Sequence, residues 1–298
     1  MTKKTNWKFL GLGFIFIALW SSASVAAKLG LKSVQPFVLY QARFTLAAFI
    51  MLSLVYIIRK GKVPKKSEFK QLALFGFLNI TCSLGLFVLA IQEVAAGIGA
   101  LQVAINPLVI TLMSALFLKS KVLWTQILGL FVALAGVAVA VYPLLETAHA
   151  TPKGLVILAL SILSYSSAAI YYSKVKWNLS TMTINAWQAL FGALFLLPIT
   201  FYFYEDVNTF DLNFAFSALW LGIPLSVIAV FLWLYLLKID TIKASYFLFL
   251  SPVFGFIYAY FILNEPFTLY TAIGLVFVLI GIYLGQKKGR FIESTFSD

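Results

Sequence analysis

One arginine inside a long apolar stretch is the side chain of this sequence best suited to binding a ligand. Arg43 lies about two helical turns into the stretch that begins at Pro36. An arginine in hydrocarbon costs about 2.5–3.5 kcal/mol, so it is expected to face a cavity or a protein partner. A guanidinium binds a carboxylate through two parallel N–H groups. Two interpretations stay open: Arg43 binds a substrate carboxylate or holds a gate, or it extends towards the membrane surface and binds a backbone carbonyl of a neighbouring helix.

A second group of polar side chains precedes two prolines. Gln102 and Asn106 are one helical turn apart, and Pro107 follows directly. A proline inside a helix removes one backbone hydrogen bond and frees a carbonyl one turn earlier, which favours a polar site at a kink. The stretch before Pro252 offers Tyr246 and Ser251. We expect these four polar residues to line a substrate site and both prolines to act in gating; the alternative is that the prolines only shape the helices and the amides only join them.

Other aromatic and small polar side chains in the apolar stretches complete the expected substrate site. They are Trp20, Ser21, Gln41, Asn79, Tyr165, Trp187 and Gln188. Aromatic residues near a membrane surface commonly anchor a helix. Trp20 and Tyr165, however, lie deep in their stretches, each followed by two serines, which favours a cavity wall or close helix packing.

Catalytic chemistry has no candidates in these stretches. The only histidine, His149, lies in a polar connection, Cys82 is the only cysteine, and no aspartate or glutamate lies in the interior of a stretch. General acid–base catalysis and metal binding need such side chains inside a site, and no nucleotide-binding loop is present. We therefore expect no enzyme, no cofactor and no metal. The lack of a buried carboxylate also argues against proton coupling.

The elements that position these residues follow from composition. The 298 residues are 62% hydrophobic and 11% charged, against about 45–50% and about 25% in a soluble domain. A helix that spans a bilayer needs about 20 mostly apolar residues. Apolar runs between charged or turn-rich breaks predict ten such helices, at 8–27, 36–58, 70–91, 97–118, 122–142, 153–173, 181–204, 213–237, 243–263 and 267–286. The expected fold is an all-α polytopic membrane protein.

Charge predicts the orientation of these helices. With the N-terminus in the cytoplasm, only three of the 22 lysines and arginines fall on the outer side, namely Lys28, Lys32 and Lys153, while Arg43 is inside a span. Cytoplasmic loops of membrane proteins carry such an excess of cations. Both termini are therefore expected in the cytoplasm. The net charge of +12 is explained by these loops and indicates no nucleic-acid partner.

An internal repeat divides the chain into two halves. A shift of 145 residues places Pro107 on Pro252, Gly129 on Gly274 and Gly136 on Gly281, and it brings the tryptophan–serine–serine–alanine run at 20–23 onto the tyrosine–serine–serine–alanine run at 165–168. Residues 1–145 and 146–298 are thus predicted to form two five-helix repeats. Because five is odd, the repeats must cross the membrane in opposite senses, and inverted repeats are typical of secondary transporters.

These features together resemble the EamA family of the drug/metabolite transporter superfamily. The resemblance rests on the five-plus-five layout, the glutamine–alanine–arginine–phenylalanine run at 41–44, and the asparagine–glutamate–proline–phenylalanine run at 264–267, followed by Gly274 and Gly281. It implies an exporter or exchanger of amino acids and other small metabolites, with a central cavity lined by helices 1–4 and 6–9. The fifth and tenth helices would serve packing and dimer contacts. The family often has an acid at the start of the last helix of both halves; here Glu265 has Ser120 as its counterpart, which predicts two unequal gates.

The sequence therefore predicts a plasma-membrane carrier that works by alternating access on a small-molecule substrate, most readily amino acids or related compounds. Its partners are the substrate and the lipid bilayer, with a homodimer compatible with the resemblance. Facilitated export or substrate exchange fits better than proton coupling. The alternatives are a carrier of drug-like or nucleotide-sugar-like solutes, and a membrane sensor or channel.

Overall fold

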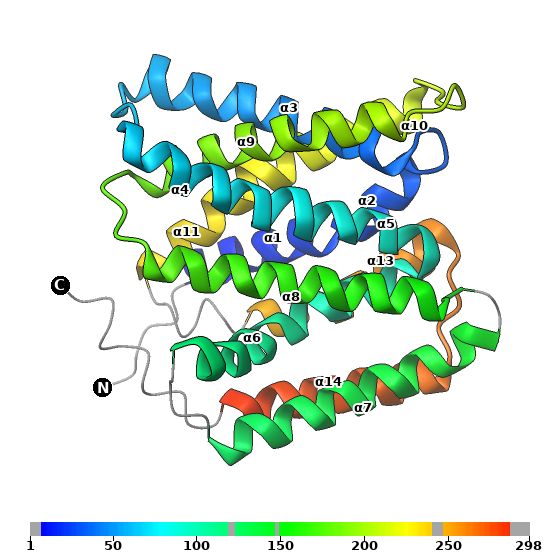
Figure 1. The fold of residues 1–298 in the computed structure, drawn as a ribbon. Coiled ribbons are helices and arrows are strands. Elements are labelled where there is room, and N and C mark those ends of the chain that lie inside the picture. Colours follow the sequence, from blue (N-terminus) through cyan, green and yellow to red (C-terminus); the bar gives the residue numbers. More distant parts are fainter. Residues whose placement is uncertain (1–6, 119–122, 147–148, 240–246, 287–298) are drawn as a thin grey trace.

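The computed structural model describes residues 7–118, 123–146, 149–239 and 247–286. In these ranges the chain is helical and no strand is formed beyond a single bridge between Val94 and Ala150 (Figure 1). The elements are α1 (Trp7–Ser21), α2 (Ala23–Gly30), α3 (Pro36–Ser53), η1 (Leu54–Ile58), α4 (Lys66–Gly76), η2 (Phe77–Leu84), α5 (Gly85–Glu93), α6 (Ala96–Leu118), α7 (Trp124–Glu146), α8 (Pro152–Lys174), α9 (Thr181–Tyr202), α10 (Leu212–Trp220), η3 (Leu221–Ala229), α11 (Val230–Ile239), η4 (Leu248–Leu250), α13 (Ser251–Leu263) and α14 (Leu269–Gln286).

Seven of the described helices are long and apolar enough to cross a membrane. They cover Trp7–Gly30, Pro36–Ile58, Lys66–Glu93, Trp124–Leu144, Pro152–Lys174, Thr181–Tyr202 and Leu212–Trp233, and two shorter apolar helices follow at Ser251–Leu263 and Leu269–Leu284. Helical residues also occupy each of the ten stretches expected from the sequence. The chain is a multi-pass membrane protein.

Local signals in the sequence explain where several helices begin. The side chains of Thr151, Ser180 and Asp211 each accept a hydrogen bond from a backbone N–H in the first turn of α8, α9 and α10. These residue types satisfy the free N–H groups at a helix start. Prolines at the first turns of α3 and α8 lose no hydrogen bond there.

Three of the long helices contain π-helical turns, which the sequence did not predict. These are η1, η2 and η3, where Ser226 Oγ also donates to the carbonyl of Leu221 across the wide turn. The 145-residue shift moves η2 onto 222–229, which lies inside η3. The two halves are therefore irregular at equivalent positions of equivalent helices. Wide turns of this kind are frequent at functional sites.

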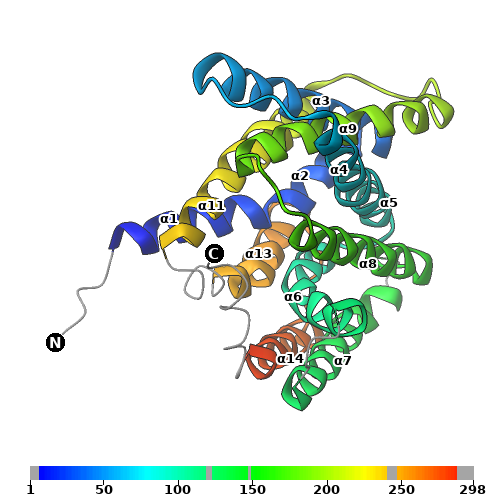
Figure 2. The same ribbon diagram turned by 60° about the vertical axis from the view of Figure 1, so that its left-hand side comes forward.

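Among the described helices, α7 and α14 share the most extensive contact, and they lie side by side in Figures 1 and 2. A Cβ added at Gly136 would meet the carbonyl oxygen of Gly274 at 2.6 Å, and one at Gly281 would meet that of Gly129 at 2.5 Å. Only glycine allows backbones to approach so closely. Because residue order reverses across the contact, α7 and α14 run antiparallel.

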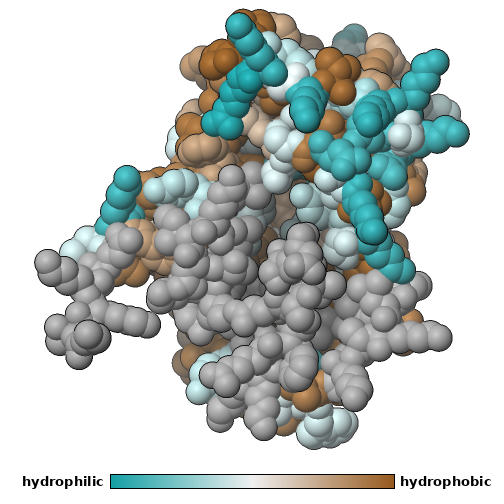
Figure 3. All heavy atoms as spheres, turned by 90° about the vertical axis from the view of Figure 1, so that its left-hand side faces the viewer, coloured by the Kyte–Doolittle hydropathy of each residue, from teal (hydrophilic) through white to brown (hydrophobic). Residues whose placement is uncertain are grey.

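The connections gather charge at two opposite ends of the molecule. The end at which α3 leads to α4 and α8 leads to α9 carries Arg59, Lys60, Lys62, Lys65, Lys66 and Lys176 and is called the basic end. Figure 3 looks onto this end and shows hydrophilic side chains over part of it. The opposite, acidic end is joined by the ion pairs Lys28–Glu265 at 3.0 Å and Lys153–Glu93 at 2.9 Å, and by Ser33 bound to Asp211.

Candidate functional site

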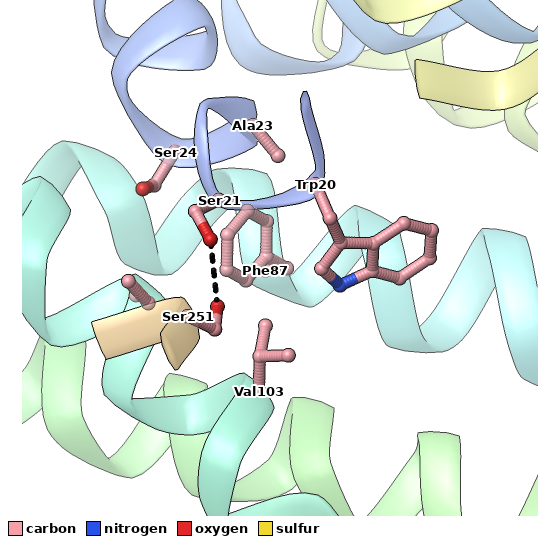
Figure 4. Close-up of a pocket in the computed structure, with 9 residues that line it drawn as sticks. Trp20, Ser21, Ala23, Ser24, Phe87, Val103 and Ser251 are labelled. Carbon is pink, nitrogen blue, oxygen red and sulfur yellow. Dashed lines mark hydrogen bonds between the residues drawn. The ribbon is translucent and has the colours of Figure 1, made fainter. Parts of the chain in front are cut away.

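A small cavity lies where helices from both halves of the chain meet (Figure 4). Its lining includes Trp20, Ser21, Ser24, Phe87, Val103 and Ser251. Ser21 Oγ donates to Ser251 Oγ at 3.2 Å, and both serines are buried. The volume of 20 Å³ is close to that of a single water molecule. The structure therefore brings three of the expected site residues, Trp20, Ser21 and Ser251, together around a cavity that has room for about one water molecule.

Beside the cavity, the first long helix is interrupted at Ser22. The Ser22 hydroxyl donates to the carbonyl of Leu19 at 2.6 Å and accepts a hydrogen bond from Trp220 Nε1 at 2.9 Å. A serine that binds the preceding turn of its own helix competes with the regular backbone pattern and bends the helix. The equivalent Ser167 also binds its preceding turn, yet α8 continues through it. The two halves therefore differ at this point.

Arg43 lies buried between α3 and η3, with 8% of its surface exposed. Its Nε–H donates to Ser226 Oγ at 3.3 Å, and its guanidinium carbon lies 5.1 Å from the ring centre of Tyr40 and 4.9 Å from that of Phe44. In the described part of the chain no carboxylate pairs with it. Among the described residues its partners are a hydroxyl and two aromatic faces, rather than the backbone carbonyl that one of the two interpretations invoked.

Ser226 is a site residue that the sequence analysis missed. It stands 183 residues from Arg43 in an ordinary apolar stretch, and no spacing connects the two. The segment η3 that carries it also packs against α1 and α2. Arg43 is thereby linked through η3 to the helix that borders the cavity.

The amides Asn79 and Gln188 join two helices and stand apart from the cavity lining. Asn79 Nδ2 donates to Gln188 Oε1 at 3.0 Å, and Gln188 Nε2 donates to Asn185 Oδ1 at 2.6 Å. Trp187 acts in the same way, because its indole N–H donates to the Tyr56 hydroxyl at 2.7 Å. For these three residues the structure favours helix contact over substrate contact.

Gln41, Gln102 and Asn106 each keep a buried side-chain oxygen with no partner among the described residues. Gln41 donates to Thr45 on its own helix. Gln102 Nε2 donates to Ser161 Oγ at 3.1 Å, and Ser161 donates onward to the Ser83 carbonyl. Gln102 thus faces α8 and η2, while its neighbour Val103 lines the cavity.

The remaining expected site residues are less well placed to act. Tyr165 is half-buried on α8, without a hydrogen-bond partner in the part of the chain that the structure describes. Tyr246 lies outside the described residues. Pro107 is in α6, as expected. Pro252, however, is in the first turn of α13, directly after the 3₁₀ turn η4, so the expectation that it kinks a helix from the inside is wrong. A proline at a helix start removes no backbone hydrogen bond.

Comparison with known proteins identifies the family of this chain. A model of the EamA-like transporter family matches residues 7–142 and again residues 152–285. The chain belongs to the EamA-like transporter family. The family model matches each half of the chain separately, which confirms the resemblance to the EamA family that the sequence motifs indicated.

The relatives of this EamA-like protein are named as transporters in several cases. An uncharacterized transporter of Archaeoglobus fulgidus is 27% identical over 95% of this chain and 99% of its own length. Protein PecM of Dickeya dadantii is 25% identical over 80% of each chain. A chloroplastic WAT1-related protein of Arabidopsis thaliana is 26% identical over 94% of this chain and 69% of its own.

A solved crystal structure shares the fold of the EamA-like chain. It superposes with a TM-score of 0.64 at 19% identity, over 94% of this chain and 98% of the other. Family and relatives together identify a membrane transporter rather than an enzyme.

Proposed function

We propose that this EamA-like protein is a secondary transporter that exports or exchanges small carboxylate-bearing metabolites, amino acids foremost, by alternating access. It would lie in the plasma membrane, with the basic end and both termini in the cytoplasm, because cations concentrate on that side of membrane proteins.

The arrangement of equivalent helices supports two inverted repeats, residues 1–145 and 146–298. Across α7 and α14, Gly136 contacts Gly274 and Gly129 contacts Gly281. The 145-residue shift relates Gly129 to Gly274 and Gly136 to Gly281, so it exchanges the two contacts and the contact set maps onto itself. The helices α3 and α9 pack together with reversed order, since Thr200 binds the Phe37 carbonyl and Trp187 binds Tyr56. Opposite directions of equivalent helices are what alternating access between two similar halves requires.

The observation that carries the substrate class is the buried Arg43. A cation held among aromatic faces in a membrane protein, with a serine hydroxyl as its hydrogen-bond acceptor, is costly unless a function retains it. A carboxylate approaching its planar N–H groups would form a two-pronged ion pair. Ser226 keeps the guanidinium oriented for it.

Counterflow into liposomes tests this proposal. Purified protein in liposomes preloaded with an unlabelled amino acid should take up the labelled amino acid saturably, and the corresponding amine without the carboxyl group should compete poorly. Arg43→Ala should abolish the uptake and Arg43→Lys should reduce it at least about tenfold, the equivalent of 1.4 kcal/mol. The control Arg59→Ala, an exposed cation at the basic end, should transport normally.

Three results would contradict the proposal. Near-normal uptake by Arg43→Ala, or equal competition by the amine, would show that transport does not depend on a substrate carboxylate bound to Arg43. Either result would favour drug-like or nucleotide-sugar-like solutes. If no metabolite in a panel gives saturable counterflow, the protein is better explained as a sensor or a channel.

A further inference from the structure

We propose that α2 is the lid of the acidic end: it is hinged at Ser22 and latched by Lys28 and Glu265 onto the start of α6. This inference rests on the proposed transport function and names the residues that hold one of its two gates. Three independent features carry it: a latch, a hinge, and space for movement.

The latch is one buried carboxylate that joins three separate segments. Glu265 has 7% of its surface exposed and lies in the connection between α13 and α14. One of its oxygens accepts the backbone N–H of Ala96 at 2.8 Å, and the other accepts that of Gly97 at 3.4 Å. Lys28, near the end of α2, lies 3.0 Å from the same carboxylate.

The position of Glu265 explains the strength of this contact. The first N–H groups of a helix have no partners within the helix and carry partial positive charge. Glu265 supplies the missing acceptor to α6 from 169 residues away. A carboxylate bound to both a helix start and an ammonium forms charge-assisted hydrogen bonds, the strong class. Opening α2 therefore requires Lys28 to leave this carboxylate.

Apolar packing seals the layer beside the latch. Val25 of α2, Ala96 of α6 and Ala259 of α13 form one buried cluster. Gly97 and Gly255 lie so close to Phe256 and Ala100 that a Cβ at either glycine would collide. The acidic end is therefore shut by α2, α6 and α13 together, directly next to the Ser21–Ser251 hydrogen bond.

The hinge is the break between α1 and α2 at Ser22. The backbone N–H of Ser22 bonds to Leu19, three residues back, and the side chain binds the same carbonyl. Helices bend sharply where such a side chain enters the backbone pattern. The eight-residue α2 can thus turn relative to α1 without breaking a continuous helix.

The space lies on the other face of α2. Ser24 of α2 lines the cavity. Val25, Ala26 and Leu29 of α2 instead border a side groove of 380 Å³, which is also lined by Trp220 of α10 and Tyr258 of α13. The groove is lined mainly by apolar side chains, and it lies on the side away from the cavity. Displacing α2 into the groove would enlarge the cavity at the acidic end.

The two halves differ at the latch, which gives the lid a preferred state. Glu265 has Ser120 as its counterpart in the first half, between Lys119 and Lys121, and these residues lie outside the described part. A serine carries no charge to attract a lysine. Because the latch stabilises closure of the acidic end, removing it should shift the population towards opening at that end.

Thiol labelling of a cavity residue tests the lid. In a Cys82→Ala background, Ser24→Cys should react slowly with a membrane-impermeant maleimide added from the acidic side. Glu265→Gln and Lys28→Met should each raise that rate at least about tenfold. The matched control is Glu93→Gln, which removes the other ion pair of the same end and should leave the rate unchanged.

Exchanging the two charges tests the contribution of the α6 N–H groups separately from that of the ion pair. The double variant Lys28→Glu with Glu265→Lys keeps opposite charges together but places an ammonium against the α6 N–H groups, so labelling should stay fast. Slow labelling of the exchange variant would overturn the role of α6. Unchanged labelling in both single variants would overturn the lid.

A cross-link keeps the test informative if a variant folds poorly. Lys28→Cys with Glu265→Cys, joined by a short cleavable cross-linker, should stop counterflow and recover it on cleavage. Full counterflow in the cross-linked protein would exclude movement of α2, while the proposed transport would stand. Absence of counterflow in the protein with Lys28 and Glu265 intact, with labelling of the variants responding as expected, would instead contradict the proposed function.

Discussion

At the scale of single residues, hydrogen-bond partners decide which polar side chains form the site. Gln102 was expected in the substrate site, but its amide binds Ser161, and Ser161 binds the Ser83 carbonyl. This chain of contacts joins α6, α8 and η2 inside the membrane-spanning region. Its role is to hold helices in place, since a buried amide without a partner is unfavourable.

Ser161→Ala should lower the stability of the protein without changing substrate affinity. The change leaves the Gln102 amide without its acceptor, at a cost of about 1 kcal/mol, and the melting temperature should fall. The control Ser167→Ala lies on the same helix, with an exposed side chain that binds only its own preceding turn, and it should melt normally. A higher KM in Ser161→Ala at unchanged stability would return Gln102 to the substrate site.

At the scale of elements, backbone proximity between α7 and α14 determines how the two halves are joined. The contact depends on glycines seven residues apart in each helix, Gly129 and Gly136 against Gly281 and Gly274. Small residues at a crossing allow van der Waals packing of backbones, which is the main attraction between helices in lipid.

Gly136→Ala and Gly274→Ala should each destabilise the protein by about 1–3 kcal/mol, because the new methyl group meets a backbone carbonyl that cannot move aside. The double variant should cost less than the sum, since both changes separate the same pair of helices. Thermal unfolding in detergent measures both. Gly11→Ala, which meets nothing within 4 Å, is the control; equal melting of all variants would contradict the proposed role of the crossing.

At the scale of the whole molecule, the difference in charge between its two ends predicts its orientation in the membrane. Asn208 is hydrogen-bonded to the backbone of Gln35, so its exposed neighbour Val207 is the better reporter of the acidic end, and the exposed Ser67 reports the basic end. In intact cells, Val207→Cys should react with an impermeant maleimide and Ser67→Cys should not. Labelling of both, or the reverse pattern, would contradict the proposed orientation.

The sequence by itself determined the membrane class, the helical character of the described residues and the family of this protein. Hydrocarbon requires a minimum length of apolar chain and excludes charge, so both constraints can be read in one dimension. That is why helices occupy every expected stretch, and why the cations of the expected cytoplasmic loops in the described part gather at one end.

Only the tertiary structure decided which polar groups meet. Ser226 against Arg43, Ser161 against Gln102 and Glu265 against the start of α6 join residues far apart in the chain. Apolar periodicity does not specify such partners, because in lipid every face of a helix is equally apolar and close packing selects the contact. The break at Ser22 and the start of α13 at Pro252 have the same origin, since each depends on neighbouring helices rather than on the local residues alone.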